Sequence, residues 1–302
     1  MRRALFALCA CPLLAHAATT ATTPEKYPQR PVRIIVNVTA GGGVDAVARI
    51  AAQHYTQLWG QPFVIDNRVG AGGSIGIELV VKAAPDAYTL LVTSSGVVTN
   101  AAARPQSYDP IRDLQPISKL TSNPYIVILT PSVPAANVKE LIALAKSRPD
   151  EIAFGSSGNG SLSHLAGEMI KSAGQVRMLH VPYKGVAIAT SDLFSGRIGL
   201  YVSPLQPLPA WIKAGRVKPV GITRAQRSSA FPDVPTIAES GVPGYDVTNW
   251  YGVLAPAKTP TAVVARLNSE LGRILRMSDV QARFRDEGGE VAPGTPEELA
   301  AF

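Results

Sequence analysis

The stretch VRIIVNVTAGGGVDAVARIAAQHYTQL, residues 32–58, decides the fold. Its first seven residues are rich in β-branched side chains and predict a strand. Three glycines at 41–43 then predict a tight turn. Apolar side chains recur at helical spacing in the remainder, at Val44, Val47, Ala48, Ala51, Tyr55 and Leu58. A strand that passes through a glycine turn into an amphipathic helix is the repeating unit of an α/β fold with a parallel sheet.

The same order of strand, turn and helix recurs along the whole chain. Further strands are predicted at 63–65, 88–93, 125–129, 152–154, 179–181, 198–202 and 217–222, and helices at 74–84, 138–146, 163–173 and from 260 onwards. Turns rich in glycine or serine follow several strands, at 70–73, 94–96 and 155–160. We therefore expect two α/β domains, one made of residues 18–122 and 225–302 and the other of residues 123–224.

The composition supports a folded chain and excludes several classes of protein. Of the 302 residues, 46% are hydrophobic and 17% are charged, so the chain can bury a core and wholesale disorder is excluded. The formal net charge is +7, but the basic residues are scattered, and the longest basic cluster is Arg2-Arg3. Binding to nucleic acid needs clustered basic residues. We therefore expect no nucleic-acid partner, and the charge favours small anionic ligands or serves solubility.

The first 17 residues, MRRALFALCACPLLAHA, have the three parts of a secretory signal peptide. Arg2 and Arg3 precede an apolar run, and Ala15-His16-Ala17 forms a cleavage site. No other stretch is apolar for the roughly 18 residues that a membrane span requires. The mature protein is therefore expected in the periplasm. A second interpretation is a lipoprotein, in which Cys11 would carry the lipid.

Both cysteines, Cys9 and Cys11, lie within this N-terminal segment. Its removal leaves no disulfide, no catalytic thiol and no cysteine-based zinc site. The histidines and carboxylates of the mature chain show no spacing that is typical of metal ligands. We therefore expect neither a metal nor another cofactor.

The first glycine turn allows three interpretations. Gly41-x-Gly43-x-x-Ala46, with Asp66 at the end of the next strand, has the spacing of a dinucleotide-binding motif. An exported protein rarely meets free NAD, which argues against that cofactor. The turn can also lack any ligand. In the third interpretation, exposed N–H groups at the start of the helix bind a smaller anion, such as a carboxylate.

A second motif, Gly72-x-Ser74-x-Gly76, matches the nucleophile elbow of serine hydrolases. Such an enzyme would also need His164 or His180 close to Ser74, together with an acidic residue. The same residues make a good N-cap for the helix that follows. A secreted serine hydrolase that uses Ser74 is therefore the alternative to a binding protein.

The richest cluster of hydrogen-bond donors is GSSGNGS at 155–161, which directly precedes a helix. Backbone N–H groups and three hydroxyls in this position favour an anion site over a flexible loop. His164, at the start of the helix, can cap it, donate to an anion or be structural. His180 lies in an apolar strand and is expected in the core. Trp250 and Tyr251 fit a cleft and a core equally well.

Taken together, these motifs resemble the Bug (TctC-type) family of periplasmic solute-binding proteins, which serve tripartite tricarboxylate transporters. The resemblance rests on Gly41-Gly42 with Asp45, DNRVGAGGSIG at 66–76, AAPDAYTLL at 83–91, SSGNGS at 156–161, HLAGE at 164–168, VPYKG at 181–185, FPDVPT at 231–236 and LAP at 254–256. These motifs occur in order and cover essentially the whole mature chain.

The resemblance implies a two-domain periplasmic-binding-protein fold of the Venus-flytrap, type II-like class, with the ligand in a cleft between the domains. It also implies a monomer without enzymatic activity. Such a protein captures a small carboxylate or an amino acid for sensing or for a tripartite transporter, whose membrane components are its partners. The ligand-binding residues that we expect are Thr39, Ala40, Gly41, Gly42, Asp45, Gly73, Ser74, Thr93, Ser94, Ser156, Ser157, Gly158, His164 and Ser203.

Four features depart from the family pattern. Val38-Thr39-Ala40 stands where an aromatic residue and a proline usually precede the two glycines, and Val44 replaces a serine or threonine. Gly199 replaces an acidic residue, and the chain stops at Phe302, where a further helix is usual. The sequence therefore does not name the ligand.

Overall fold

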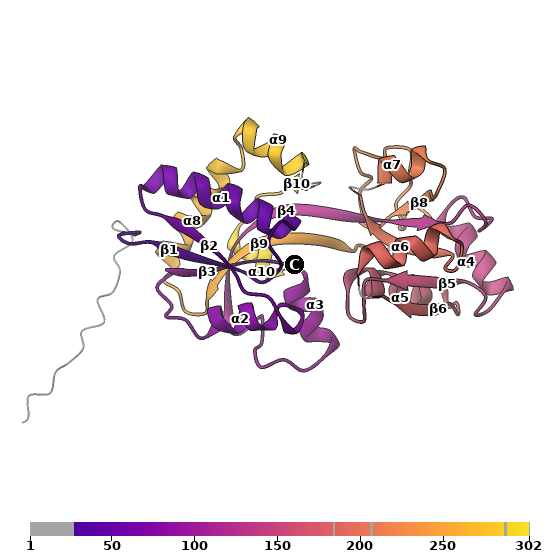
Figure 1. Cartoon of the computed structure of the whole chain (residues 1–302), viewed down its shortest axis with the longest axis horizontal. Helices are drawn as coiled ribbons and strands as arrows, with labels where there is room; N and C mark the ends of the chain where they lie inside the picture. The colour runs from indigo at the N-terminus through magenta and orange to yellow at the C-terminus, as the bar shows by residue number, and fades with distance from the viewer. Residues whose placement is uncertain (1–26, 184, 206–207, 287–288, 302) are drawn as a thin grey trace, which may run out of the picture.

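The computed structural model describes residues 27–183, 185–205, 208–286 and 289–301. These residues form a ten-stranded sheet in which the neighbours run β2-β1-β3-β9-β4-β7-β5-β6, with β8 and β10 also paired to β4. Helices cover the sheet, and the molecule divides into two lobes (Figure 1). The predicted signal peptide and the alternative lipid site at Cys11 lie outside the described residues.

The first lobe is built on the strands β1, β2 and β3, which are parallel, and on β9, which is antiparallel to β3. Its strands are β1 (Val32–Val36), β2 (Phe63–Asn67), β3 (Thr89–Ser94), β9 (Thr248–Pro256) and β10 (Glu290–Val291). Its helices are α1 (Gly43–Trp59), η2 (Ala71–Gly73), α2 (Ser74–Val81), α3 (Gly96–Ala103), α8 (Thr261–Ile274), α9 (Ser278–Asp286) and α10 (Pro296–Ala301).

The second lobe repeats the order of strand, turn and helix. Its strands are β5 (Ala153–Ser156), β6 (Leu179–Pro182), β7 (Leu200–Pro204) and β8 (Lys218–Ile222). Its helices are α4 (Val138–Ser147), α5 (Leu162–Gly174), α6 (Val186–Phe194) and α7 (Leu208–Lys213). No helix in the described part of the chain is long and apolar enough to cross a membrane.

Strand β4 (Leu114–Leu129) belongs to both lobes. Its residues 114–124 pair with β9 of the first lobe, and its residues 125–129 pair with β7 and β8 of the second. Figure 1 shows β4 and β9 side by side as the long strands between the lobes. Both of these pairings are antiparallel, so the sheet is mixed, whereas the sequence pattern predicted a parallel sheet. The alternation of strands and helices predicts parallel pairs within a lobe, but not the direction of the strands that cross between lobes.

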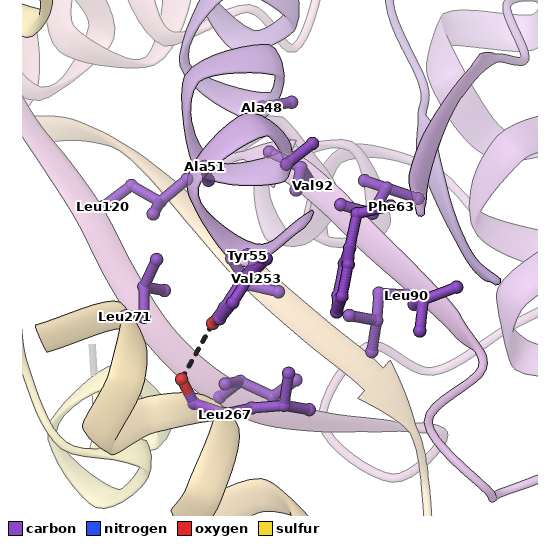
Figure 2. Packing of buried hydrophobic residues seen from close by; sticks show 14 of the residues in the cluster. Ala48, Ala51, Tyr55, Phe63, Leu90, Val92, Leu120, Val253, Leu267 and Leu271 are labelled. Carbon is purple, nitrogen blue, oxygen red and sulfur yellow. Dashed lines mark hydrogen bonds between the residues drawn. The ribbon is translucent and has the colours of Figure 1, made fainter. Parts of the chain in front are cut away.

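Separate hydrophobic cores fill the two lobes. In the first lobe, α1 packs against the sheet and against α8, and Figure 2 shows Ala48, Ala51 and Tyr55 facing the strands and Leu267. In the second lobe, β4, β5 and β7 pack against α4 and α5. Val242, Tyr245 and Val247 are buried in the same second-lobe cluster as Val127 and Leu200. We therefore infer that the chain returns to the first lobe at β9.

The Tyr55 hydroxyl ties α1 to α8. It donates to the carbonyl oxygen of Leu267 at 2.8 Å, and the tyrosine is 1% exposed (Figure 2). Burial raises the pKa of Tyr55 well above its ordinary value, so the hydroxyl stays a neutral donor. The ring stacks on Trp59 and on Phe63, with centroid distances of 4.9 and 4.8 Å.

Tyr55→Phe should therefore lower the free energy of unfolding by about 1 kcal/mol, because it removes one buried hydrogen bond and keeps the packing. Tyr55→Ala should cost roughly 3–5 kcal/mol, because a large ring is lost from the core. Leu58→Ala on the same helix is the control, since Leu58 is 41% exposed. Urea unfolding measures all three variants. An unchanged midpoint for Tyr55→Phe would show that this hydrogen bond contributes nothing.

Candidate functional site

The turn between β1 and α1 leaves backbone donors unpaired. Gly42 is the N-cap of α1, and no side chain caps this end of the helix. Within the part of the chain that the structure describes, the N–H groups of Gly43 and Val44 have no acceptor. Thr39 and Ala40 are exposed beside them. The start of α1 thus offers free donors and the positive end of a helix dipole.

Asp45 holds this turn in shape. Its carboxylate accepts hydrogen bonds from the Gly41 N–H, from Arg49 and from Asn67, each at 2.9 Å, and the residue is 2% exposed. Burial by itself would raise the pKa of Asp45, but the hydrogen bonds from Arg49, Gly41 and Asn67 together hold it below its usual value. The Asp45 carboxylate is therefore charged, and its contact with a ligand stays a prediction.

A second turn of the first lobe lies against the end of β1. Gly70, Ala71, Gly72 and Gly73 all have positive φ angles. A side chain at Gly73 would place its Cβ 2.5 Å from Nδ2 of Asn37, so this position requires glycine for its space as well as for its backbone. The glycines thus let the 70–73 turn pack onto the strand end that leads into the first turn.

Ser74 follows directly and does not have the surroundings of a nucleophile. It is 7% exposed, and its hydroxyl donates to Oε1 of Gln106 at 2.6 Å. The two histidines that a catalytic triad would need, His164 and His180, lie together in the second lobe, where they stack at 4.0 Å. A nucleophile needs a base within hydrogen-bond reach. The hydrolase alternative therefore gains no support.

Tyr251 lies beside both the end of β3 and the start of α1. Thr93 is fully buried, and Ser94 is the register partner of Tyr251 on β9. The Tyr251 hydroxyl lies 3.0 Å from the place where a Cβ on Gly43 would stand. The Ser94 hydroxyl accepts the Gly96 N–H at 3.3 Å. Predicted residues from the ends of β1 and β3 are thus gathered on one side of the first lobe, where ligands bind in open α/β sheets.

The serine-rich turn after β5 satisfies most of its own donors. The N–H of Ser157 donates to the Ser163 hydroxyl at 3.0 Å, and the N–H of Gly160 donates to Nδ1 of His164 at 3.1 Å. Gly158 donates to the Ser156 hydroxyl at 3.2 Å. Its serines and His164 therefore build the turn itself, and their contact with a ligand stays a prediction.

Two stacked histidines, His164 and His180, contact the serine-rich turn. Nε2 of His180 lies 2.7 Å from the Ser156 hydroxyl, and both imidazoles are half-buried beside Phe154. Burial lowers the pKa of His180, and the neighbouring His164 lowers it further. The Ser156–His180 contact has the form of a nucleophile and its base, but Ser156 is 0% exposed. His180 was expected in the core, whereas it lies half-buried on an edge strand.

Three tyrosines lie at the crossing of the lobes, and the sequence analysis singled out only one of them, Tyr251. Burial raises the pKa of Tyr125 on β4, and Tyr251 of the first lobe and Tyr201 of the second raise it further. Tyr201 is itself buried, and hydrogen bonds with Ser163 and Ser157 offset part of the rise in its pKa. Tyr125 lies on β4 where the strand passes from one lobe to the other, Tyr251 pairs with Thr121 of β4, and Tyr201 pairs with Ile128 of β4. The sequence could not predict that these tyrosines lie close together, because they are far apart along the chain. Only the pairing of β4 with β7 and β9 brings them together.

Ser203 is the remaining predicted residue. It is fully buried on β7, and its hydroxyl donates to the carbonyl oxygen of Pro204 at 2.9 Å. The described residues contain no group of three histidine, cysteine or carboxylate side chains that could hold a metal ion.

The lobes approach each other at the end of α3. A Cβ on Gly160 of the second lobe would stand 3.0 Å from Cβ of Ala103 and 3.9 Å from Oδ1 of Asn100. Figure 1 shows α3 on the side of the first lobe that faces α5. Asn100 also donates to the Gly72 carbonyl at 3.1 Å. The 70–73 turn, α3 and the serine-rich turn therefore meet at one seam.

The histidine pair predicts a pH dependence of stability. Because the pKa of His180 is lower in the folded state than its ordinary value of 6.5, the unfolded chain binds a proton more readily. The stabilising effect of neutral His180 is therefore present above about pH 6.5 and lost as the pH falls below that value. His180→Gln should show a smaller loss of unfolding free energy between pH 7.5 and 5.5. Urea unfolding of both proteins at the two pH values measures this loss. An equal loss of unfolding free energy in the wild type and in His180→Gln would contradict the prediction.

Known proteins share both the sequence and the fold. The profile of the family described as "Tripartite tricarboxylate transporter family receptor" (TctC) matches residues 47–302. Protein BugT of Bordetella pertussis is 32% identical over 281 residues, which cover 92% of this chain and 86% of BugT.

Two solved structures superpose on most of the chain. Rpa4515 of R. palustris, solved with adipate, is 35% identical with a TM-score of 0.75, over 91% of this chain and 93% of that one. MatC from Rhodopseudomonas palustris, with bound malate, is 31% identical with a TM-score of 0.73, over 91% and 95%. The two-domain periplasmic-binding-protein fold and the resemblance inferred from the motifs are both confirmed. The chain therefore belongs to the TctC family, the receptors of tripartite tricarboxylate transporters.

Proposed function

We propose that this protein is a periplasmic receptor that captures a small carboxylate or an amino acid. It delivers this ligand to the membrane components of a tripartite tricarboxylate-type transporter, or reports it to a sensor. The observation that carries the proposal is the start of α1, a 17-residue helix whose first N–H groups have neither a side-chain cap nor another acceptor among the described residues. Such an end attracts a carboxylate through hydrogen bonds and through the helix dipole.

Gly42 supports a ligand at this position. Its backbone angles, φ −82° and ψ 164°, suit any residue, so the turn does not need glycine there. A Cβ at Gly42 would meet only the carbonyl oxygen of Thr39, at an ordinary 3.5 Å. The missing side chain therefore serves neither the backbone nor the packing. It leaves space in front of the free donors, which lets a ligand approach the main chain.

Three further points agree with this function. The solved relatives Rpa4515 and MatC hold adipate and malate, which are carboxylates. The predicted signal peptide at residues 1–17 supports export to the periplasm. A catalytic role is disfavoured, because the hydroxyls of Ser74 and Ser156 are both buried and hydrogen-bonded within the protein. We also propose that the receptor acts as a monomer.

The charge of the ligand is tested by thermal denaturation with matched pairs of compounds. Succinate, malate and adipate each retain two carboxylates, and their diamides keep the same carbon chains without the charge. At least one acid should raise the melting temperature, because binding to the folded state stabilises it, and the matching diamide should not. Equal shifts from an acid and its diamide would contradict carboxylate recognition at the start of α1.

The variant Gly42→Val tests whether the ligand binds at the free N–H groups at the start of α1. Valine fits the backbone there, so the fold should survive, but its side chain should block the carboxylate and abolish the thermal shift. Gly272→Val is the control, since Gly272 lies on α8 and its Cβ would meet only the end of Arg276, at 3.5 Å. Gly158→Val is less informative, because a φ of +131° there strains any side chain. Unchanged affinity in a folded Gly42→Val variant would exclude this turn as the binding site.

A further inference from the structure

The serine-rich turn after β5 uses His164 as a hydrogen-bond acceptor. Nδ1 of His164 accepts the N–H of Gly160 at 3.1 Å. A backbone N–H can only donate, so Nδ1 carries no proton and the ring proton of neutral His164 lies on Nε2. Protonation makes both ring nitrogens donors. The imidazolium form of His164 is therefore incompatible with the hydrogen bond that holds Gly160.

The contact of the second imidazole, His180, survives a proton. The Ser156 hydroxyl accepts the N–H of Gly158 at 3.2 Å and lies 2.7 Å from Nε2 of His180. While His180 is neutral, the hydroxyl donates its proton to Nε2. When His180 is protonated, the hydroxyl accepts from Nε2 and turns its proton to the Gly158 carbonyl oxygen, at 3.2 Å. Of the two histidine contacts, only the one with Gly160 must therefore break in acid.

The charges around the two rings direct a proton to His164. Nε2 of His164 faces the Glu168 carboxylate at 3.9 Å, and Lys171 pairs with the same carboxylate at 2.8 Å. The ring of His180 stacks on that of His164 at 4.0 Å, so a second positive charge is costly. Burial and the neighbouring His164 lower the pKa of His180, whereas Glu168 opposes this change and Lys171 adds to it. Tyr201, which hydrogen-bonds to serines of the turn, stays neutral because burial raises its pKa.

Gly160 lies where this turn meets the first lobe. A Cβ on Gly160 would stand 3.0 Å from Cβ of Ala103 on α3. Gly160 has a φ of +77°, a backbone conformation that favours glycine. The hydrogen bond to His164 holds the Gly160 N–H in this conformation, beside α3. Loss of the bond therefore acts on the second lobe's side of the seam.

We propose that His164 is a pH-sensitive latch of the serine-rich turn. It holds the N–H of Gly160 while its imidazole is neutral, and it releases this N–H when the imidazole takes up a proton. Acid thereby loosens the turn at the seam between the lobes. Histidine suits this role because its ordinary titration falls between pH 5 and 8. The latch works without a ligand, so it goes beyond the proposed function and does not depend on it.

NMR of the full mature chain, without ligand, follows the latch directly. Asn159-Gly160 is the only Asn-Gly pair in the sequence, so ¹³C-labelled asparagine with ¹⁵N-labelled glycine isolates the Gly160 amide. Between pH 7.5 and 5.0, the Gly160 amide proton should shift upfield, because the amide loses its acceptor. The midpoint should coincide with that of the His164 ring protons. A Gly160 amide shift that stays constant over this range would overturn the proposal.

Three histidine variants assign the response. The side-chain oxygen of His164→Asn can accept the Gly160 N–H but does not titrate, so the amide shift should stay constant. His180→Gln keeps a hydrogen-bonding group beside Ser156 and leaves His164 in place, so the Gly160 titration should persist. His54→Gln is the matched control, because His54 lies on α1 of the first lobe and is the remaining histidine outside the predicted signal peptide. It should titrate like the wild type.

Circular dichroism at both pH values establishes that each variant is folded. A Gly160 titration that persists in His164→Asn, or that disappears in His180→Gln, would assign the response to another group and overturn the proposal. If His164→Asn does not fold, the midpoints in the wild type decide, since a Gly160 midpoint that differs from that of the His164 ring protons would also overturn it.

Discussion

The continuous backbone ladder of β4 is the constraint on which the rest of the structure depends. One strand of 16 residues pairs with β9 in the first lobe and with β7 and β8 in the second. Because a strand cannot slip in one lobe without disturbing its register in the other, β4 fixes where the two sets of turns face each other. Tyr125 lies on β4 at this crossing, between Thr121, which pairs with Tyr251, and Ile128, which pairs with Tyr201. The seam between α3 and the serine-rich turn follows from the same arrangement.

A set of polar side chains, buried or half-buried, then decides which backbone donors stay free. Asp45 accepts the N–H of Gly41, and His164 accepts the N–H of Gly160, so both turns are held by hydrogen bonds within the protein. What remains open is the start of α1, where Gly42 supplies space instead of a cap. In this account the polar side chains position the main chain, and the main chain contacts the anion. The charge of Asp45 is compensated by Arg49, so it does not oppose a carboxylate nearby.

Local pattern predicted much of this fold, and it failed where distant segments meet. The helix of residues 44–58 and the glycine turn before it were predicted well, because helical spacing is a local property. Strand β4 was predicted only from residue 125, because Pro116 and Pro124 interrupt the pattern of its first half, where the register also shifts. Helix α3 was missed, because the run GVVTNAAA has no polar face to mark it. At the site, the glycine turns could be predicted. The contacts of Ser157 and Gly160 with Ser163 and His164 could not, because they depend on side-chain orientation.

A crystal structure of the protein with the dicarboxylate that gives the largest thermal shift tests the central claim most directly. The account predicts one carboxylate within hydrogen-bond distance of the Gly43 and Val44 N–H groups, in the space that Gly42 leaves open. The groove beside α1 and β2, which Arg49, Gln53 and Val64 line, offers an alternative place for an anion. A carboxylate bound there, with the first N–H groups of α1 still unpaired, would contradict the account.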